Sequence, residues 1–306
     1  MRANKAGKAN NANNASNTNK ATVKLRKPLR PGRVASRTVY HILLIAISLF
    51  FFLPFFLMIS TSFKPQAETV SITPLLPVEP TLDGYRMVFD RNIMPFFTYL
   101  GNTLFLAVIS VTGAVFSNSI VAYSLSRIRW RGRNLLFALT MAVMMMPGAV
   151  TMVPVYVMFS RLNLVGTYVP LIAPSFFGSA FAIFLLRQFF MGLPKSLEDA
   201  ARIDGCSQLG IYSRIFLPLM KPALITIGIF TFTATWNDFL GPLIYLSDDR
   251  MFTLQMGLHR LRSMTFIVST PSLMAMAFLI TLPMIILFFF AQKHFVKGVT
   301  FSGVKA

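Results

Sequence analysis

The stretch Glu198-Asp199-Ala200-Ala201-Arg202-Ile203-Asp204-Gly205 is polar and helical in pattern, yet it lies between two long apolar segments. Ser196 is a suitable N-cap for this helix, and Asp199, three residues later, is placed for a capping box. The two leading acids also favour the positive end of the helix dipole. A membrane protein has no packing reason to keep a short charged helix between spans, so we predict that it contacts a soluble partner. The alternative is a linker helix lying on lipid headgroups.

The residues that follow fit a short helix with a sharp end. Gly205 allows a backbone conformation, or a close approach, that is barred to other residues. A second helical stretch is predicted near residues 208–216 and leads into Leu217-Pro218. Pro218 and Pro222 then restrict the backbone at the start of the next apolar segment.

The composition indicates an integral membrane protein. The chain has 306 residues, of which 55% are hydrophobic and 13% charged, and its mean hydropathy is +0.62. A soluble domain of this composition would expose large apolar patches, whereas a bilayer accepts them. The net charge of +19 does not indicate nucleic-acid binding, because the basic residues lie in a terminal tail and in short loops.

The reactive residues give no sign of a metal or redox site. The single cysteine, Cys206, excludes an internal disulfide and a cysteine-based metal cluster. The three histidines (His41, His259 and His294) are far apart and lack metal-ligand spacing. We expect no metal and no cofactor in this chain.

Six apolar runs predict six transmembrane helices, each long enough to cross a bilayer. They cover residues 39–59, 99–125, 135–159, 168–190, 223–246 and 273–292. The fold class is therefore all-α, with the short polar helix between the fourth and fifth spans. We expect four parts along the chain. Residues 1–37 are a disordered, basic, Asn-rich cytoplasmic tail, and residues 38–98 hold the first span and a long outer segment. Residues 99–293 are the permease core, and residues 294–306 are a cytoplasmic C-terminal tail.

Lysine and arginine residues set the orientation. If the N-terminal tail is cytoplasmic, 22 of them fall in inner segments and 7 in outer ones. Both ends are then cytoplasmic, and so is the polar helix. The outer segments are residues 60–98, with a short amphipathic piece near 84–89, then 160–167 and 247–272.

With its surroundings, the polar helix resembles the cytoplasmic signature of permease subunits of ABC importers. That signature has Glu, then Ala or Asp, then Ala, a glycine several residues on, and then Ile-x-Leu-Pro. The resemblance implies a coupling helix that docks on an ATPase subunit, with ATP and Mg²⁺ bound in that subunit and none in this chain. The coupling residues it implies are Glu198, Asp199, Ala200, Ala201, Asp204, Gly205, Ile215, Leu217 and Pro218. Asp199 departs from the more usual Glu or Ala, and Cys206 stands where Ala is common.

Further motifs resemble sugar-importer permeases of the maltose-system type. They are Asn102-Thr103, 123–127, Trp236-Asn237-Asp238-Phe239-Leu240 with Pro242-Leu243, Phe252-Thr253-Leu254 and 295–305. The similarity covers residues 40–306 and is that of the six-span partner, the G-type. It implies a carbohydrate permease of a prokaryotic cell membrane. The partners it implies are two ATP-binding subunits, a second homologous permease and an extracytoplasmic sugar-binding protein.

Trp236, Asn237 and Asp238 are the candidate substrate contacts. Asp238 is the only acid inside a predicted span, and such a carboxylate is a functional hypothesis by default. Trp236 could stack on a sugar while the other two bond hydroxyls; alternatively, all three pack against neighbouring helices. A different reading makes Asp238 the coupling acid of an ion-driven secondary transporter acting alone. A third is a membrane scaffold whose polar helix recruits a partner without transport.

Overall fold

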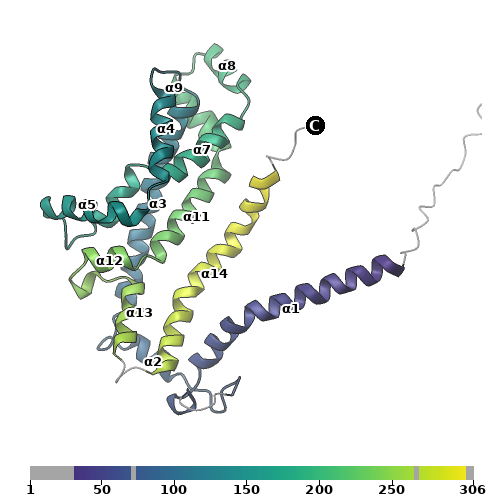
Figure 1. Ribbon diagram of the computed structural model, residues 1–306, viewed down its shortest axis with the longest axis vertical. Coiled ribbons are helices and arrows are strands. Elements are labelled where there is room, and N and C mark those ends of the chain that lie inside the picture. The colour runs from purple at the N-terminus through teal and green to yellow at the C-terminus, as the bar shows by residue number, and fades with distance from the viewer. Residues whose placement is uncertain (1–30, 70–73, 265–268, 301–306) are drawn as a thin grey trace, which may run out of the picture. The chain divides into compact units, whose positions relative to one another are not determined.

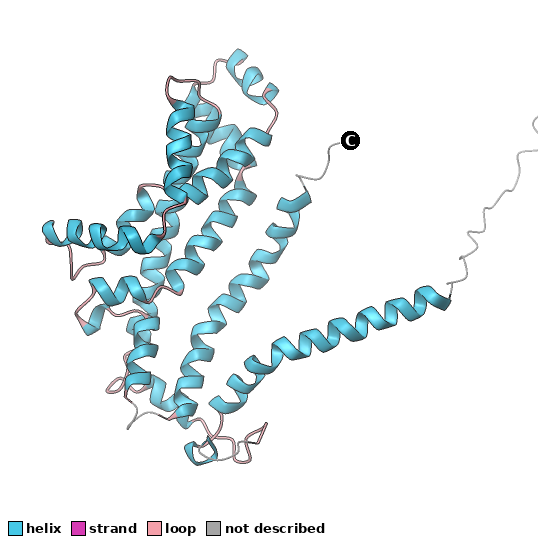
Figure 2. Cartoon of the chain, viewed as in Figure 1, coloured by secondary structure: helices cyan, strands magenta, loops and turns pink. Residues whose placement is uncertain are grey.

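Every regular element in the described part of the chain is a helix (Figure 2). The computed structural model describes residues 31–69, 74–264 and 269–300. The chain divides into two units, residues 1–54 and 55–306. Residues 1–30 of the predicted tail lie outside the described residues. Helix α1 begins at Pro31, and the part of it that is apolar enough to cross a membrane begins at Thr38. The division of the chain at residue 37 stays a prediction. The C-terminal tail is likewise helical at its start, since α14 continues to Thr300.

Four helices among the described residues are long and apolar enough to cross a membrane, or up to six if each of two bent pairs forms one span. The four are Thr38–Ser62 within α1 (Pro31–Ser62), α3 (Phe96–Ser126), Val169–Gly192, and Thr270–Gln292 within α14 (Thr270–Thr300). The bent pairs are α4 (Arg133–Met144) with α5 (Gly148–Arg161), and Gln208–Leu219 with α11 (Lys221–Trp236). The all-α prediction is confirmed for the described residues.

Three predicted spans are not single continuous α-helices. In the fourth, the short elements α6 (Val169–Ile172) and η2 (Ala173–Phe176) precede α7 (Ala180–Gly192). The third bends by 102° between α4 and α5, at Pro147, which has no backbone N–H to continue the ladder. The fifth was expected to run over residues 223–246, but α11 ends at Trp236 and a short α12 (Leu240–Tyr245) follows. The Asp238 carboxylate accepts the Gly241 N–H at 3.0 Å, which satisfies a free donor at the start of α12.

Helix α3 forms the centre of the second unit and packs against both α7 (Ala180–Gly192) and α11. Its buried positions include small residues such as Ala107, Ser110 and Ala114, which allow close helix approach in a membrane. At Gly113 a Cβ atom would lie only 2.6 Å from the Phe176 ring. The short elements around these helices are η1 (Gln66–Thr69), α6 (Val169–Ile172), η2 (Ala173–Phe176), η4 (Asp249–Met251) and α13 (Leu254–Ser263).

Buried apolar residues form one cluster toward each end of this unit. One cluster contains Tyr123, Phe190 and Phe216, and the other Tyr99, Trp236 and Leu254. The polar helix α8 (Ser196–Ile203) lies at one end, whereas α2 (Asp83–Phe89) and α13 lie at the other (Figure 1). Helix α2 covers the short piece that was predicted to be amphipathic in the first outer segment, residues 84–89. The fold thus separates α8 from two of the three segments predicted to be outer, residues 60–98 and 247–272.

Candidate functional site

Helix α8 begins at Ser196, one residue earlier than its capping pattern predicted. Its N-cap is Lys195, whose carbonyl accepts the N–H groups of Glu198 and Asp199 at 2.9 and 3.0 Å. No side-chain cap is formed, so the N-cap prediction for Ser196 and the capping box with Asp199 are wrong. The helix start relies instead on Glu198 and Asp199 in its first turn, where negative charge is favourable.

The two faces of α8 differ sharply. Glu198 and Ala201, three residues apart, are 7% and 4% exposed and turn toward the protein. Asp199, Ala200 and Asp204 are exposed. Ile203 is apolar but 86% exposed, so its side chain is not buried in the described part of this chain. The outward face is therefore small, acidic and partly apolar.

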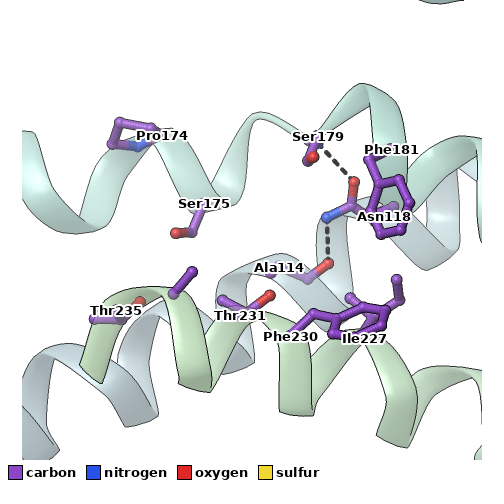
Figure 3. Close-up of a pocket in the computed structure, with 13 residues that line it drawn as sticks. Ala114, Asn118, Pro174, Ser175, Ser179, Phe181, Ile227, Phe230, Thr231 and Thr235 are labelled. Carbon is purple, nitrogen blue, oxygen red and sulfur yellow. Dashed lines mark hydrogen bonds between the residues drawn. The ribbon is translucent and has the colours of Figure 1, made fainter. Parts of the chain in front are cut away.

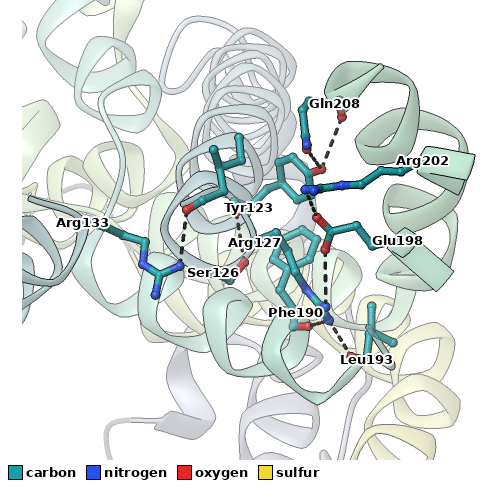
Figure 4. Close-up of polar contacts among 10 residues, drawn as sticks. Tyr123, Ser126, Arg127, Arg133, Phe190, Leu193, Glu198, Arg202 and Gln208 are labelled. Atoms are coloured by element: carbon teal, nitrogen blue, oxygen red, sulfur yellow. Dashed lines mark hydrogen bonds and ion pairs between the residues drawn. The ribbon is translucent and has the colours of Figure 1, made fainter. Parts of the chain in front are cut away.

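A buried ion pair holds the inward face (Figure 4). The Glu198 carboxylate lies 2.6 Å from Arg202 Nη2 and 3.8 Å from Arg127 Nη1. The Arg202 side chain is half exposed, whereas the side chains of Glu198 and Arg127 are only 10% and 5% exposed. A buried ion pair is costly to break by removing one partner, because the other charge remains desolvated.

Arg127 connects three helices at this point. Its guanidinium donates to the Phe190 and Leu193 carbonyls at the end of α7 and lies 4.8 Å from the centre of the Phe216 ring. Burial lowers the pKa of the Arg127 guanidinium, while the Glu198 carboxylate opposes that shift. Arginine keeps its charge under these conditions, so a buried cation joins the end of α3 to α7 and α8. This role was not predicted, because in the sequence Arg127 is the first of four closely spaced arginines, residues 127–133.

Gly205 ends α8 in a Schellman motif. Its N–H bonds the Arg202 carbonyl at 3.1 Å, and the Cys206 N–H bonds the Ala201 carbonyl at 2.9 Å. Gly205 has φ +76°, and a Cβ atom there would meet nothing within 4 Å. The glycine is thus needed for its left-handed backbone, and the space around it is open. The left-handed conformation predicted as one possibility for Gly205 is confirmed. The other possibility, a close approach of another part of this chain to Gly205, is not seen among the described residues.

The segment after α8 packs firmly against α3. It consists of α9 (Gln208–Gly210), a π-helical turn η3 (Ile211–Phe216) and α10 (Leu217–Leu219), which confirms the second helical stretch. The Tyr212 and Ser119 hydroxyls lie 2.7 Å apart, and the Tyr123 hydroxyl donates to Gln208 Oε1 at 3.1 Å. Ile215 and Leu217 are half-buried and Pro218 is exposed. π-Helical turns are often found at functional sites.

The three candidate substrate residues occupy different environments. Trp236 is fully buried, donates its indole N–H to the Ile280 carbonyl at 3.1 Å and stacks on Phe232. It therefore packs in the core of this chain, which agrees with the packing alternative for this residue, and its contact with a sugar stays a prediction. Asn237 is exposed, and its Nδ2 donates to the Thr233 carbonyl at 2.8 Å. Asp238 is half-buried and caps α12.

Sequence reasoning missed a cavity of about 460 Å³ between α3, η2, α7 and α11, whose largely apolar lining carries several polar groups (Figure 3). Asn118 shapes one wall: its Nδ2 donates to the Ala114 carbonyl at 2.6 Å, and its Oδ1 accepts the Ser179 N–H at 2.7 Å. Hydroxyl side chains supply further polar groups, from Ser175, Ser179, Thr231 and Thr235. The spacing of Ile227, Thr231 and Thr235 at every fourth residue was the available signal, since it puts them on one helix face.

No group of three or more His, Cys, Asp or Glu residues in the described ranges could hold a metal ion. Two sets of polar groups bear on function: those of α8 with its arginine partners, and those that line the cavity. Neither set contains a nucleophile paired with a base. The first suits docking, and the second suits contact with a hydroxylated solute.

Known proteins share this sequence and fold. The arabinooligosaccharides transport system permease protein AraQ of Bacillus subtilis (strain 168) is 36% identical over 275 residues, which cover 88% of this chain and 97% of AraQ. The inner membrane ABC transporter permease protein YcjP of Escherichia coli (strain K12) is 36% identical over 259 residues, or 82% of this chain and 90% of YcjP.

A solved structure has a similar fold. It is a chain of a bacterial ABC transporter involved in the import of the acidic polysaccharide alginate. The TM-score is 0.75 at 26% sequence identity, covering 87% of this chain and 99% of that one. ABC permeases are non-enzymatic membrane components, and the ATPase is a separate subunit. Residues 118–301 match the family model described as "Binding-protein-dependent transport system inner membrane component". The chain therefore belongs to this family of ABC transporter permeases, as its signature around Gly205 predicted.

Proposed function

We propose that this chain is the permease subunit of an ATP-driven importer and that, with a second homologous permease, it forms the path for a carbohydrate. The names of its relatives support the solute class, since AraQ is named for arabinooligosaccharides and the structural neighbour imports alginate. An oligosaccharide or a related sugar fits the hydroxyl-bearing wall of the cavity. Six spans, with both termini in the cytoplasm, fit the distribution of Lys and Arg.

The two-faced geometry of α8 carries this proposal. Its inward face is fixed by Glu198 and Arg127, while its outward face presents Ala200, Ile203 and Asp204 to the surroundings. A short helix that is anchored on one side and bare on the other suits a groove on another protein. We infer that this partner is an ATPase subunit, which supplies ATP and Mg²⁺, and that two such subunits serve the pair of permeases.

Movement of α8 would reach the membrane part through packed contacts. Arg127 links α8 to the ends of α3 and α7, and the Tyr123–Tyr212–Phe216 cluster links the segment after α8 to α3. Helix α11 begins directly after that segment. Closure of the ATPase pair would therefore shift α11 against α3, and both of these helices line the cavity. An extracytoplasmic binding protein would deliver the solute at the opposite end.

The substrate path in this proposal runs along α11. Thr231 and Thr235 line the cavity, and Asn237 and Asp238 follow at the end of the helix. Trp236 supports this path from the core by fixing α11 to α14 through the Ile280 carbonyl. The tryptophan thus serves as a positioning residue.

Affinity purification of the full chain from its native membrane in mild detergent tests the proposal. We expect an ATPase, a second permease and a sugar-binding protein to be recovered with it, and the reconstituted assembly to take up a sugar only with ATP. Uptake by this chain alone in vesicles, driven by an ion gradient without ATP, would support the ion-coupled alternative and refute the importer. Matched membranes that express an untagged chain control for adventitious capture.

Replacing Thr231 with valine should weaken transport without disturbing the fold. The shape is kept while one hydroxyl is lost from the cavity wall, and an unmatched hydrogen bond typically costs about 1 kcal/mol, or roughly fivefold. We expect the KM for uptake to rise severalfold with little change in maximal rate. Thr281→Val is the matched control, since Thr281 lies on α14 and donates to its own helix at Ala277. Equal KM values for the two variants would show that the Thr231 hydroxyl does not contact the solute.

A further inference from the structure

A second, strongly basic cavity lies beside α8, and the transport mechanism above does not use it. Its volume is about 730 Å³. Among its lining residues, six are basic and two are acidic; they are Arg127, Arg129, Arg133, Arg187, Lys195 and Arg202, with Glu198 and Asp199. Cations crowded at this density repel one another unless an anion compensates them.

The acids of the cavity do not provide this compensation. Glu198 is already paired with Arg127 and Arg202. In the described part of the chain, no carboxylate lies within 4.0 Å of a side-chain nitrogen of Arg129, Arg133 or Arg187. The cavity therefore carries an excess of positive charge on one side, formed by these three arginines.

Two of the three arginines are held in place by the fold. Arg187 donates through Nε to the Leu125 carbonyl at 3.2 Å, and its guanidinium lies 3.9 Å from the centre of the Phe137 ring. Arg133 donates through Nη1 to the Ile128 carbonyl at 3.3 Å. Each guanidinium has five donors, so several remain for another acceptor. Positioned guanidinium forks suit bidentate binding of phosphate.

The start of helix α4 adds a further attraction for anions. Gly132 is its N-cap, without a side-chain hydrogen bond, and no acid lies in the first turn. The free N–H groups at such a start favour negative charge. A smaller cavity of about 280 Å³ adjoins this start and shares Arg129 and Arg133 with the basic cavity. Backbone and side chains thus favour an anion at the same place.

The apolar surroundings indicate what carries the anion. Along α4, Leu135, Leu136 and Leu139 are 66%, 47% and 54% exposed, and they begin directly beyond Arg133. Trp130, 39% exposed, lies beside the arginines, and tryptophan is enriched at the membrane–water interface. A free phosphate ion would use only the arginines. A phospholipid would use the arginines for its headgroup and the leucines for its acyl chains.

We propose that the cavity lined by Arg129, Arg133 and Arg187 binds the phosphate of an anionic phospholipid, with the acyl chains along the exposed leucines of α4. Basic pockets between membrane helices are suited to such headgroups. The bound lipid would lie against the same wall as Glu198 and Arg202, and so beside α8. This inference does not depend on which solute the transporter carries.

The test measures lipid binding to the full chain, purified together with the subunits that accompany it and stripped of lipid in neutral detergent. Native mass spectrometry would titrate phosphatidylglycerol, with phosphatidylcholine as the neutral lipid. We expect the Arg129→Gln/Arg133→Gln variant to bind phosphatidylglycerol roughly 25-fold more weakly, because each of the two basic residues near a membrane surface contributes about fivefold. Arg161→Gln/Arg262→Gln, with two exposed arginines outside the cavity, should bind like the unmodified chain.

Three outcomes would overturn the proposal. One is equal phosphatidylglycerol binding by the two double variants, and another is phosphatidylcholine binding as tight as that of phosphatidylglycerol. The third is arginine-dependent binding of inorganic phosphate with no lipid retained, which would assign the site to a free ion. If the glutamine variant fails to fold, Arg129→Lys/Arg133→Lys keeps the charge and loses the forks, and it should weaken binding severalfold.

Discussion

Replacing Gly205 with arginine is expected to abolish uptake while leaving membrane insertion intact. The glycine has φ +76°, where a residue with a Cβ atom costs about 1 kcal/mol. That strain is local and too small to unfold the chain. A Cβ at this position would meet nothing within 4 Å, so the long arginine side chain would project into the space where we propose that the ATPase docks. Uptake in vesicles, alongside membrane yield, measures both effects.

Gly205→Asn separates strain from obstruction. Asparagine tolerates the left-handed conformation better than other residues with a Cβ atom, and its side chain is short. We expect the asparagine variant to retain most of its uptake and the arginine variant to lose at least about a hundredfold, which corresponds to roughly 2.8 kcal/mol of docking energy. The arginine variant should also recover less ATPase on affinity purification. Full uptake and full ATPase recovery with Gly205→Arg would refute the docking assignment.

The local features of this site were predictable from the sequence, because their causes are local. A short polar helix with acids at its start and a glycine after its end can be recognised in the sequence, because the acids favour the helix N-terminus and the glycine favours a left-handed C-terminal residue. The exact N-cap was wrong by one residue, since Lys195 accepts the first N–H bonds without any side chain. The first residue of a helix is therefore hard to predict to better than one or two positions.

The tertiary features were not predictable in the same way. In the sequence, Arg127 is one of four arginines at alternating positions from 127 to 133, and only the packing of α3, α7 and α8 buries it against Glu198. Trp236 looked like a sugar-stacking residue, but the Ile280 carbonyl on α14 takes its indole N–H. Helix breaks occur near Pro147 and after Trp236. Each break leaves backbone N–H and C=O groups that need other hydrogen-bond partners, such as the Asp238 carboxylate for the Gly241 N–H. A run of apolar residues does not reveal such partners.

Glu198→Gln should release α8 from its anchor. The substitution keeps the shape of the side chain but leaves Arg127, with a side chain 5% exposed, as a buried cation without its carboxylate. Removing one partner from a buried ion pair costs about 3–5 kcal/mol, which exceeds what a helix of eight residues contributes by itself. We expect uptake to fall more than tenfold, and ATP hydrolysis to lose its dependence on substrate. Hydrogen exchange of the α8 amides should accelerate.

The matched control for exchange is Asp199→Asn, which removes the same charge from the neighbouring, exposed position and should leave the α8 amides protected. A second variant distinguishes lost anchoring from general damage. Because an apolar pair can replace a buried ion pair at little cost, Arg127→Met/Glu198→Met should recover part of the protection that Glu198→Gln loses. If Glu198→Gln and Asp199→Asn exchange alike, the ion pair does not anchor α8. If only the double variant fails, Arg127 matters through the α7 carbonyls it binds, and the anchor lies between α3 and α7.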